Sequence, residues 1–329
     1  MCSIADGSLK ERTVVLLVGG TSTEREVSLQ SGRALLSALD GLAAKGRIGD
    51  RRLIEITADG NWLEDGASCL PLESPGLDPA RVVLLLGLHG GSGEDGTLQG
   101  ALALRGLRHT GSGVAASALG MDKWASRLLA EAHGLRVAQG VLADGVAPVL
   151  SGTGPWFVKP RRGGSSVATT RVDAAGDIAD AIDAVVATGD QALIETAVEG
   201  VELTVGVVES PSGEPQALPL VEIVPHEGRF FDFEEKYSSQ GAREVCPPES
   251  VSDEQAAAVA ALGLAAYHAL GCRGYARIDF ILPAEGEAVF LEANTLPGFT
   301  PRSLLPQAAA AVGLSFEDLV ERVLERALA

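Results

Sequence analysis

The sequence has few cysteines and little basic charge. Of its 329 residues only four are cysteines, and no two of them form a CxxC pair. This scattering fits a reducing compartment better than a disulfide framework or a zinc site. Lys and Arg number 26 against 44 Asp and Glu, which gives a formal net charge of -18. Such an excess of negative charge argues against a nucleic-acid or anionic-membrane partner.

Long apolar runs are also missing. No uncharged stretch is long enough to span a bilayer, and the start, M-C-S-I-A-D-G-S-L-K-E-R, lacks the apolar core of a signal peptide. We therefore expect a soluble cytoplasmic protein. With 46% hydrophobic residues the chain can bury a substantial core, and its length suits two or three domains.

The first third of the chain alternates buried strands with helices. The β-branched and Leu run at 13–18 ends in Gly19-Gly20, and 81–88 ends in His89-Gly90-Gly91. Helical spacing extends over 24–39 between them. This alternation predicts a parallel, doubly wound α/β sheet, in which ligands bind at the carboxyl ends of the strands.

Further elements follow after Asp122. Helices are predicted at 124–133, 177–187 and 253–270, and strands at 156–159, 192–195, 202–208, 218–224, 276–282 and from Phe290. The polar, irregular segment 231–248 is predicted to be a loop.

Two Gly-rich segments suggest phosphate binding. Gly91 to Gly96 spells G-x-G-x-x-G, but Glu94 and Asp95 inside it would repel a pyrophosphate, so a nicotinamide site is disfavoured. The segment K-P-R-R-G-G-S-S, from Lys159, places a cation at a strand end before a Gly-Ser loop, where backbone N–H groups can surround phosphate oxygens. An exposed basic turn explains the second segment equally well.

Two residue pairs spaced x, x+2 carry the strongest chemical signal. Arg277 and Asp279 share one face of a predicted strand, and Glu292 and Asn294 share one face of the next. If these strands are antiparallel neighbours, three oxygen-bearing side chains converge on a site suited to Mg²⁺. The alternative is a surface ladder in which Arg277 pairs with Asp279 or Glu292.

Four other residues have both a functional and an ordinary explanation. Glu24 either complements a helix dipole or holds a substrate ammonium. His89 is a loop histidine or a substrate contact. Lys236 and Tyr237 belong either to a lid over phosphates or to a solvated loop.

Five segments in one order resemble the D-alanine–D-alanine ligase family of the ATP-grasp superfamily. They are G-G-T-S-T-E-R-E-V-S-L, H-G-G-S-G-E-D-G-T-L-Q-G, T-G-S-G-V-A-A-S-A-L-G-M-D-K, V-K-P-x-x-x-G-S-S-V, and R-I-D-F followed by L-E-A-N-T-L-P-G-F-T-P-R-S-L-L-P. Each is weak alone, but together they are specific, and the resemblance runs from about residue 13 to the end.

The resemblance implies an ATP-grasp fold of three α/β domains: 1–122 for substrate binding, 123–203 as the central ATP-grasp domain and 204–329 as the catalytic ATP-grasp domain. It implies ATP-dependent joining of two D-alanines through a D-alanyl phosphate, with Mg²⁺ or Mn²⁺, to supply the peptidoglycan precursor. It is compatible with a homodimer.

The resemblance also implies residue roles. ATP would contact Lys123, Lys159, Ser165, Ser166, Glu195, Ala197, Val198, Glu202 and Lys236. The amino-acid substrates would contact Glu24, His89, Arg277, Gly298, Ser303 and Leu304. The metal would be held by Asp279, Glu292 and Asn294. The catalytic set would be Glu24, Ser165, Tyr237, Arg277 and Gly298.

Within these sets, Glu24 would hold the first ammonium. Arg277 and the Gly298 N–H would stabilise the tetrahedral oxyanion. Tyr237 would hydrogen-bond toward Ser165 and Glu24, closing the site.

Two features concern the loops around the site: Ala168 departs from the family pattern in the loop expected over ATP, and Tyr237 bears on the second substrate. Ala168 stands where the family usually has Gly, and Tyr237 favours D-alanine as acceptor over D-lactate. Two other functions stay open: a ligase with D-lactate, D-serine or another acceptor, and a nucleotide-binding regulator without catalysis. A regulator would not need Arg277, Asp279, Glu292 and Asn294 together.

Overall fold

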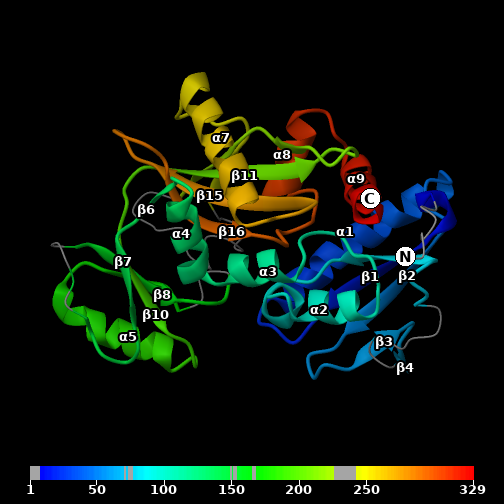
Figure 1. The fold of residues 1–329 in the computed structure, drawn as a ribbon, viewed down its shortest axis with the longest axis horizontal. Coiled ribbons are helices and arrows are strands. Elements are labelled where there is room, and N and C mark those ends of the chain that lie inside the picture. Colours follow the sequence, from blue (N-terminus) through cyan, green and yellow to red (C-terminus); the bar gives the residue numbers. More distant parts are fainter. Residues whose placement is uncertain are drawn as a thin grey trace.

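A computed structural model describes residues 8–69, 72, 77–148, 150, 154–164, 168–225 and 242–329. Its strands form three sheets, which succeed one another broadly along the chain (Figure 1). We call these the N-terminal, central and catalytic sheets, the last name following the domain role that the resemblance implies. The mixed α/β fold class expected from the sequence is confirmed.

The N-terminal sheet has the strand order β4-β3-β2-β1-β5. β1 (Thr13–Gly19) pairs in parallel with both β2 (Asp50–Ile56) and β5 (Val82–Leu86). This confirms the two predicted buried strands. β3 (Trp62–Glu64) and β4 (Ala67–Cys69) add an antiparallel edge. α1 (Arg25–Ala44) packs on β1, and η1 (Leu9–Glu11), η2 (Gly91–Gly93) and α2 (Thr97–Leu104) complete this region.

The central sheet is antiparallel throughout, in the order β7-β10-β8-β9. Its strands are β7 (Gly140–Ala143), β8 (Trp156–Pro160), β9 (Thr170–Val172) and β10 (Ala192–Thr196). η3 (Ala175–Asp177) leads into α5 (Ile178–Val186), which covers one face. Buried side chains of these elements, including Trp156 and Ile182, form a core of their own.

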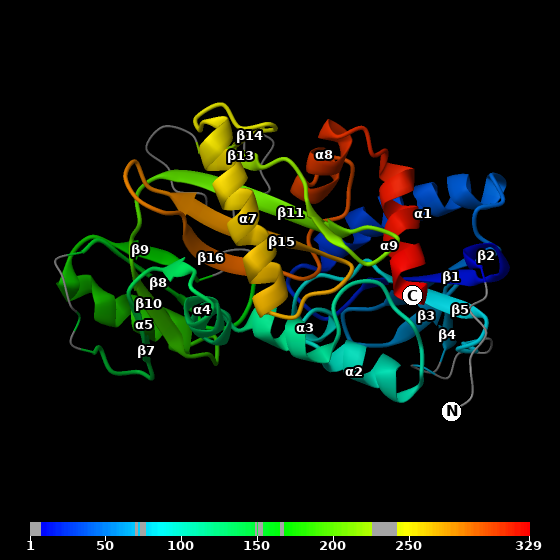
Figure 2. The ribbon, with the colours of Figure 1, turned by 45° about the horizontal axis from the view of Figure 1, so that its top comes forward.

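The catalytic sheet has seven strands. Its path runs β14 (Arg243–Val245), β13 (Val221–Val224), β11 (Val201–Glu209), β15 (Tyr275–Leu282), β16 (Val289–Asn294) and β6 (Arg136–Val137), and β12 (Pro215–Ala217) pairs with β11. α7 (Asp253–Ala269) lies across this sheet (Figure 2) and begins with a capping box between Ser252 and Gln255. The sequence predicts a loop throughout 231–248, and that prediction is wrong at 243–245, which form β14. Residues 231–241 of this segment lie outside the described part.

The chain order and the packing differ at two places. α3 (Val114–Met121) and α4 (Lys123–Ala132) precede the central sheet but pack against β16, and β6 pairs with it in parallel. α8 (Leu304–Ala311) and α9 (Phe316–Leu328), which were not among the predicted helices, join the N-terminal sheet in one buried core. Figure 2 shows α9 beside α1. The domain boundaries at 122 and 203 stay predictions.

Candidate active site

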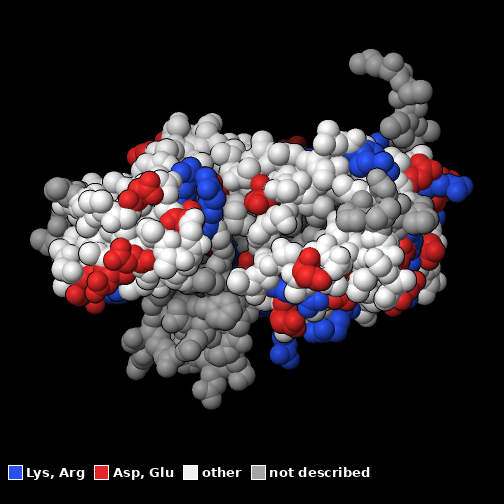
Figure 3. Space-filling model, turned by 90° about the horizontal axis from the view of Figure 1, so that it is seen from below, with Lys and Arg blue, Asp and Glu red and all other residues white. Residues whose placement is uncertain are grey.

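One pocket of about 510 Å³ lies where the three sheets approach one another. Its walls include Glu24 from the start of α1, Lys159 from the central sheet and Asp279 from the catalytic sheet. Figure 3 shows Lys and Arg atoms bordering the hollow between the central sheet's lobe and the rest of the molecule. Basic groups at the hollow suit an anionic ligand despite the acidic chain.

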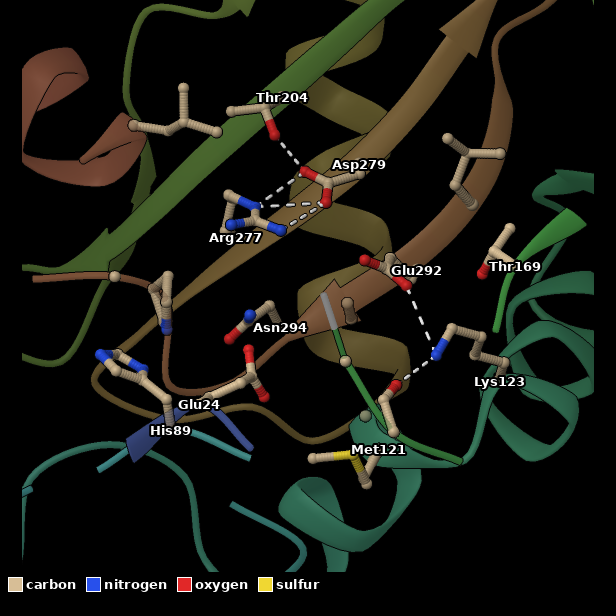
Figure 4. A pocket seen from close by; sticks show the side chains of 18 of the residues that line it. Glu24, His89, Met121, Lys123, Thr169, Thr204, Arg277, Asp279, Glu292 and Asn294 are labelled. Atoms are coloured by element: carbon tan, nitrogen blue, oxygen red, sulfur yellow. Dashed lines mark hydrogen bonds and ion pairs between the residues drawn. The ribbon is translucent and has the colours of Figure 1, made fainter. Parts of the chain in front are cut away.

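The floor of the pocket is formed by β15 and β16. They are antiparallel neighbours, with Arg277 opposite Asn294 and Asp279 opposite Glu292. All four side chains line the pocket (Figure 4). The strands are antiparallel neighbours, as the prediction required, and the side chains of Asp279, Glu292 and Asn294 line the same pocket.

A β-bulge separates the polar floor from the apolar core behind it. The register shifts after Asp279, so that Phe280 pairs with Phe290 and Leu291 is the extra residue. Strict alternation would place Phe290 on the same face as Glu292. Instead Phe290 packs edge-on against Phe280 in the core while Leu291 and Glu292 both line the pocket. Bulges commonly re-aim side chains near functional sites in this way.

Arg277 and Asp279 form an ion pair within the pocket. Arg277 Nη2 lies 2.8 Å from Asp279 Oδ2, Nε lies 3.0 Å from Oδ1, and the Thr204 hydroxyl also donates to Asp279. The side chains are only 15% and 12% exposed, respectively. The pairing that the alternative explanation required is thus present, but it lies inside a pocket and not on a surface.

The donor set at this floor fits a hard divalent cation. Asp279 and Glu292 supply carboxylates, and Asn294 supplies an amide oxygen that also accepts the Leu296 N–H at 2.9 Å. Over the described ranges, no cluster of three or more His, Cys, Asp and Glu could hold a metal. Two carboxylates and an amide suit Mg²⁺, which commonly takes its remaining ligands from phosphate and water.

Two lysines face this floor. Lys123 Nζ lies 3.8 Å from Glu292 Oε2 and donates to the Gly163 carbonyl. Lys159 Nζ lies 2.5 Å from Glu195 Oε2, and Arg127 Nε lies 3.2 Å from the other oxygen of Glu195. Each lysine thus contacts a carboxylate that holds its ammonium group at the pocket.

Two glycines approach Glu24 closely, and a third lies against Ser303. Gly90, at φ +66°, approaches so closely that a Cβ there would lie 2.3 Å from Glu24 Oε2. A Cβ on Gly164 would lie 2.9 Å from the same oxygen. Gly298 lies against Ser303, whose Oγ would be 2.9 Å from an added Cβ. Glycine at these positions leaves room for the side chains that shape the substrate end.

Nearly all predicted site residues in the described part line this pocket. Ala197 does not, and its N–H donates to the Pro155 carbonyl at 2.9 Å, whereas the neighbouring Val198 does line the pocket. The other pocket-lining members are Glu24, His89, Lys123, Lys159, Glu195, Glu202, Arg277, Asp279, Glu292, Asn294, Gly298, Ser303 and Leu304. Ser165, Ser166, Lys236 and Tyr237 lie outside the described residues.

Comparison with known proteins supplies the family. A family model described as the D-ala D-ala ligase C-terminus matches residues 148–325. A D-alanine–D-alanine ligase of Mannheimia succiniciproducens is 39% identical over 96% of this chain and 98% of its own length. One from Actinobacillus succinogenes is 41% identical, with 97% and 98% covered. This chain belongs to the D-alanine–D-alanine ligase family. It is therefore an ATP-dependent ligase.

Solved structures agree with this ligase over its whole length. D-alanyl-alanine synthetase A from Vibrio cholerae has a TM-score of 0.84 at 27% identity, covering 98% of this chain and 99% of that one. The VanG D-Ala:D-Ser ligase from Enterococcus faecalis has a TM-score of 0.82 at 28% identity, covering 96% and 99%. Among the described residues, no helix of the ligase has the length and apolar character needed to cross a membrane.

Glu94 is a pocket residue of the ligase to which the sequence analysis gave no role. It is buried, and its carboxylate accepts the Gly90 N–H at 2.8 Å. Burial, reinforced by the Glu24 charge, raises the pKa of Glu94 to about 8. Two acidic residues in the Gly-rich segment 91–96 were the available signal, but only the fold shows that Glu94 turns inward.

Proposed function

We propose that the ligase joins two D-alanine molecules into D-alanyl-D-alanine at the expense of ATP. One observation carries this assignment. A single pocket combines the Glu24 carboxylate with Lys123 and Lys159, over a floor of Arg277, Asp279, Glu292 and Asn294. Family membership supplies the reaction, and this pocket offers a complementary group for each charge on its reactants.

The first step transfers the γ-phosphoryl group. A carboxylate oxygen of the first D-alanine attacks the γ-phosphorus and the bond from that phosphorus to the β-phosphate oxygen breaks. The products are D-alanyl phosphate and ADP, the leaving group. Glu24 holds the ammonium of this D-alanine, while Lys123 and Lys159 hold the phosphates. Catalysis of such transfers rests on positioning and charge neutralisation.

The second step forms the amide. The amine of the second D-alanine attacks the acyl carbonyl, the carbon–oxygen bond to phosphate breaks, and inorganic phosphate leaves. Negative charge develops on the carbonyl oxygen, and Arg277 and the Gly298 N–H would stabilise it; both residues line the pocket. Ser303 and Leu304, at the start of α8, bind the second carboxylate.

Asp279, Glu292 and Asn294 are the residues that would hold Mg²⁺ or Mn²⁺. When bound, the metal ion neutralises the phosphate oxygens during transfer. The protein's own part is to keep three oxygen donors on one face of two paired strands, with Thr204 and Arg277 holding Asp279 in place.

The test is a product assay with D-alanine, ATP and Mg²⁺. We expect D-alanyl-D-alanine, ADP and phosphate in equal amounts. Absence of turnover with D-alanine as the only amino acid would overturn the proposal.

D-serine is the second candidate acceptor, because the similar VanG structure is named a D-Ala:D-Ser ligase. The assay is therefore repeated with D-serine and with D-lactate added to D-alanine, and the mixed products are quantified. Faster formation of a mixed product than of D-alanyl-D-alanine would reassign the acceptor.

The same family membership supports a role in supplying the peptidoglycan precursor in the cytoplasm, with a homodimer as the expected assembly. Sedimentation of the purified chain tests the assembly. Restoration of growth to cells that lack their own D-alanine–D-alanine ligase tests the role.

A further inference from the structure

The loop after β16 carries Gly298 and is held at two points by the N-terminal region. The carbonyl of Leu296 lies 2.9 Å from His89 Nδ1. The N–H of Phe299 donates to Ser31 Oγ at 3.3 Å. These two backbone groups flank Pro297-Gly298 on either side, so the segment between them is fixed at both ends.

The two holding side chains also contact each other. His89 Nε2 lies 2.9 Å from Ser31 Oγ. The Leu296 carbonyl can only accept, so Nδ1 must carry the proton that it receives. In a neutral imidazole Nε2 is then an acceptor, and the Ser31 hydroxyl donates to it while accepting from Phe299. Each polar group in this closed ring has a partner of the right kind.

The side chains that form this hydrogen-bonded ring are buried. Ser31 is 0% exposed and His89 is 6% exposed, and Leu296 and Phe299 are also buried. Burial lowers the pKa of His89, although the Leu296 carbonyl and the Glu24 charge oppose this, so the neutral imidazole is the favoured form. A buried polar ring of this kind specifies one arrangement, because a broken member leaves its partner unsatisfied.

This hydrogen-bonded ring links α1 to the loop after β16, and both contribute residues to the substrate site. Ser31 lies on α1, whose N-terminal boundary is Glu24, and His89 follows β5. The loop that they hold belongs to the catalytic sheet. The same helix therefore bears the group that would hold the first ammonium and a group that fixes the backbone of the oxyanion loop.

We propose that Ser31 is a positioning residue of the ligation reaction, acting through His89 and the 296–299 loop to set the Gly298 N–H relative to Glu24. This inference rests on the proposed function. It makes no use of a direct contact between Ser31 and a substrate, and it explains why both ring nitrogens of His89 are occupied by protein groups.

Ser31→Ala tests the proposal, with Ser28→Ala as its matched control. Ser28 lies one turn earlier on α1, is equally buried, and also makes two hydrogen bonds, from the Gly19 N–H and to the Gly87 carbonyl. Both of its partners belong to the N-terminal region. The two variants lose similar hydrogen bonds, so they should lose similar thermal stability, but only Ser31→Ala releases the loop.

We expect Ser31→Ala to lower kcat by roughly 10- to 100-fold, since small misplacements of reacting groups have effects of this size. The KM for ATP should stay unchanged, Ser28→Ala should keep its kcat within about threefold of wild type, and Ser31→Thr should recover part of the loss because it retains the hydroxyl. Equal kcat values for the two alanine variants would overturn the proposal.

A second measurement does not depend on turnover. The imidazole ¹⁵N signals of His89, assigned with a His89→Asn variant, should show a protonated Nδ1 and an unprotonated Nε2. Ser31→Ala should shift the Nε2 signal, and Ser28→Ala should not. Protonation at Nε2 in the wild-type protein would show that the proposed hydrogen-bond pattern is wrong, even if the ligase is fully active. If the product assay gives no D-alanyl-D-alanine but His89 shows a protonated Nδ1 and an unprotonated Nε2, the assigned reaction is wrong and the hydrogen-bonded ring is still supported.

Discussion

The N-terminal sheet shares one hydrophobic core with α8, α9 and parts of the catalytic sheet, whereas the central sheet has a separate core. The two regions line one pocket but are attached to its floor differently. In the described part of the chain, no helix or strand between β7 and β10 packs extensively against an element outside that region. Apolar burial thus fixes the substrate end to the floor, while the ATP end depends on other contacts.

Those contacts are polar. Asp122, which caps α4, accepts from Arg161 Nη2 at 2.7 Å, and the Lys123 N–H donates to the Arg161 carbonyl at 2.9 Å. Polar contacts without a shared apolar core are typical of interfaces between domains that move relative to one another. We therefore expect the central region to move relative to the floor more readily than the N-terminal region does.

The largest effect is expected at the floor that both regions share. Glu292→Gln removes a charge from the proposed metal site and from the Lys123 contact, and should reduce kcat about 10³-fold, as losing a strong charge-stabilising group commonly does. Steady-state assays and circular dichroism measure activity and folding. Glu222→Gln is the control, because this buried carboxylate binds the Glu249 and Ser250 N–H groups outside the pocket. Near-normal turnover by Glu292→Gln would remove the metal assignment.

The next effect concerns the substrate end and pH. Burial raises the pKa of Glu94 in the folded protein to about 8, above the ordinary value of 4.5 for a glutamate, so between these pH values the folded state retains a proton that the unfolded state has released. Its contribution to stability is complete below the unfolded pKa and is lost as pH rises toward the folded pKa. From about pH 5 to about pH 7.5 the wild type should lose roughly 3 kcal/mol relative to Glu94→Gln.

Urea unfolding of both proteins at several pH values measures this difference. Parallel pH profiles for the wild type and Glu94→Gln would show that Glu94 does not titrate in this way.

A smaller effect separates the two ends of the pocket. Glu195→Gln weakens the contacts that hold Lys159 and Arg127, so the KM for ATP should rise roughly tenfold, or ~1.4 kcal/mol, with little change in the KM for D-alanine. Asp173→Asn is the control on the same region, since the Asp173 side chain is 76% exposed and pairs with Arg171. An equal rise in the KM for ATP and the KM for D-alanine would contradict separate binding of the two ligands.

The smallest effect concerns Ala168, where the family usually has Gly. Its φ is +54°, in the left-handed region that disfavours residues with a Cβ. Ala168→Gly should stabilise the central region by about 0.5 kcal/mol, the strain relief slightly exceeding the added flexibility of the unfolded chain. Ala174→Gly, at an extended φ of -120°, should destabilise by a similar amount. Thermal unfolding of the two variants decides, and a loss of stability in both would argue against strain at Ala168.

Local spacing was sufficient to predict several parts of the ligase. The helices predicted at 124–133 and 253–270 correspond to α4 and α7 within a residue, because apolar periodicity and caps act over a few turns. The x, x+2 pairs that became Arg277–Asp279 and Glu292–Asn294 needed only the geometry of a strand and one assumption about strand pairing.

Other features depend on partners far apart in sequence. The same alternation rule fails at Leu291, where a bulge lets Phe290 reach Phe280 while Glu292 stays in the pocket. The inward turn of Glu94 and the contact of α9 with α1 have no local signature.

The sequence by itself determined the strand faces and most of the pocket's side chains, because backbone geometry fixes which neighbours along the chain point the same way. Only the tertiary structure decided that Ser31 and His89 meet the loop at Leu296 and Phe299. The reason is that non-local contacts are selected by which packing buries the most apolar surface while satisfying every polar group.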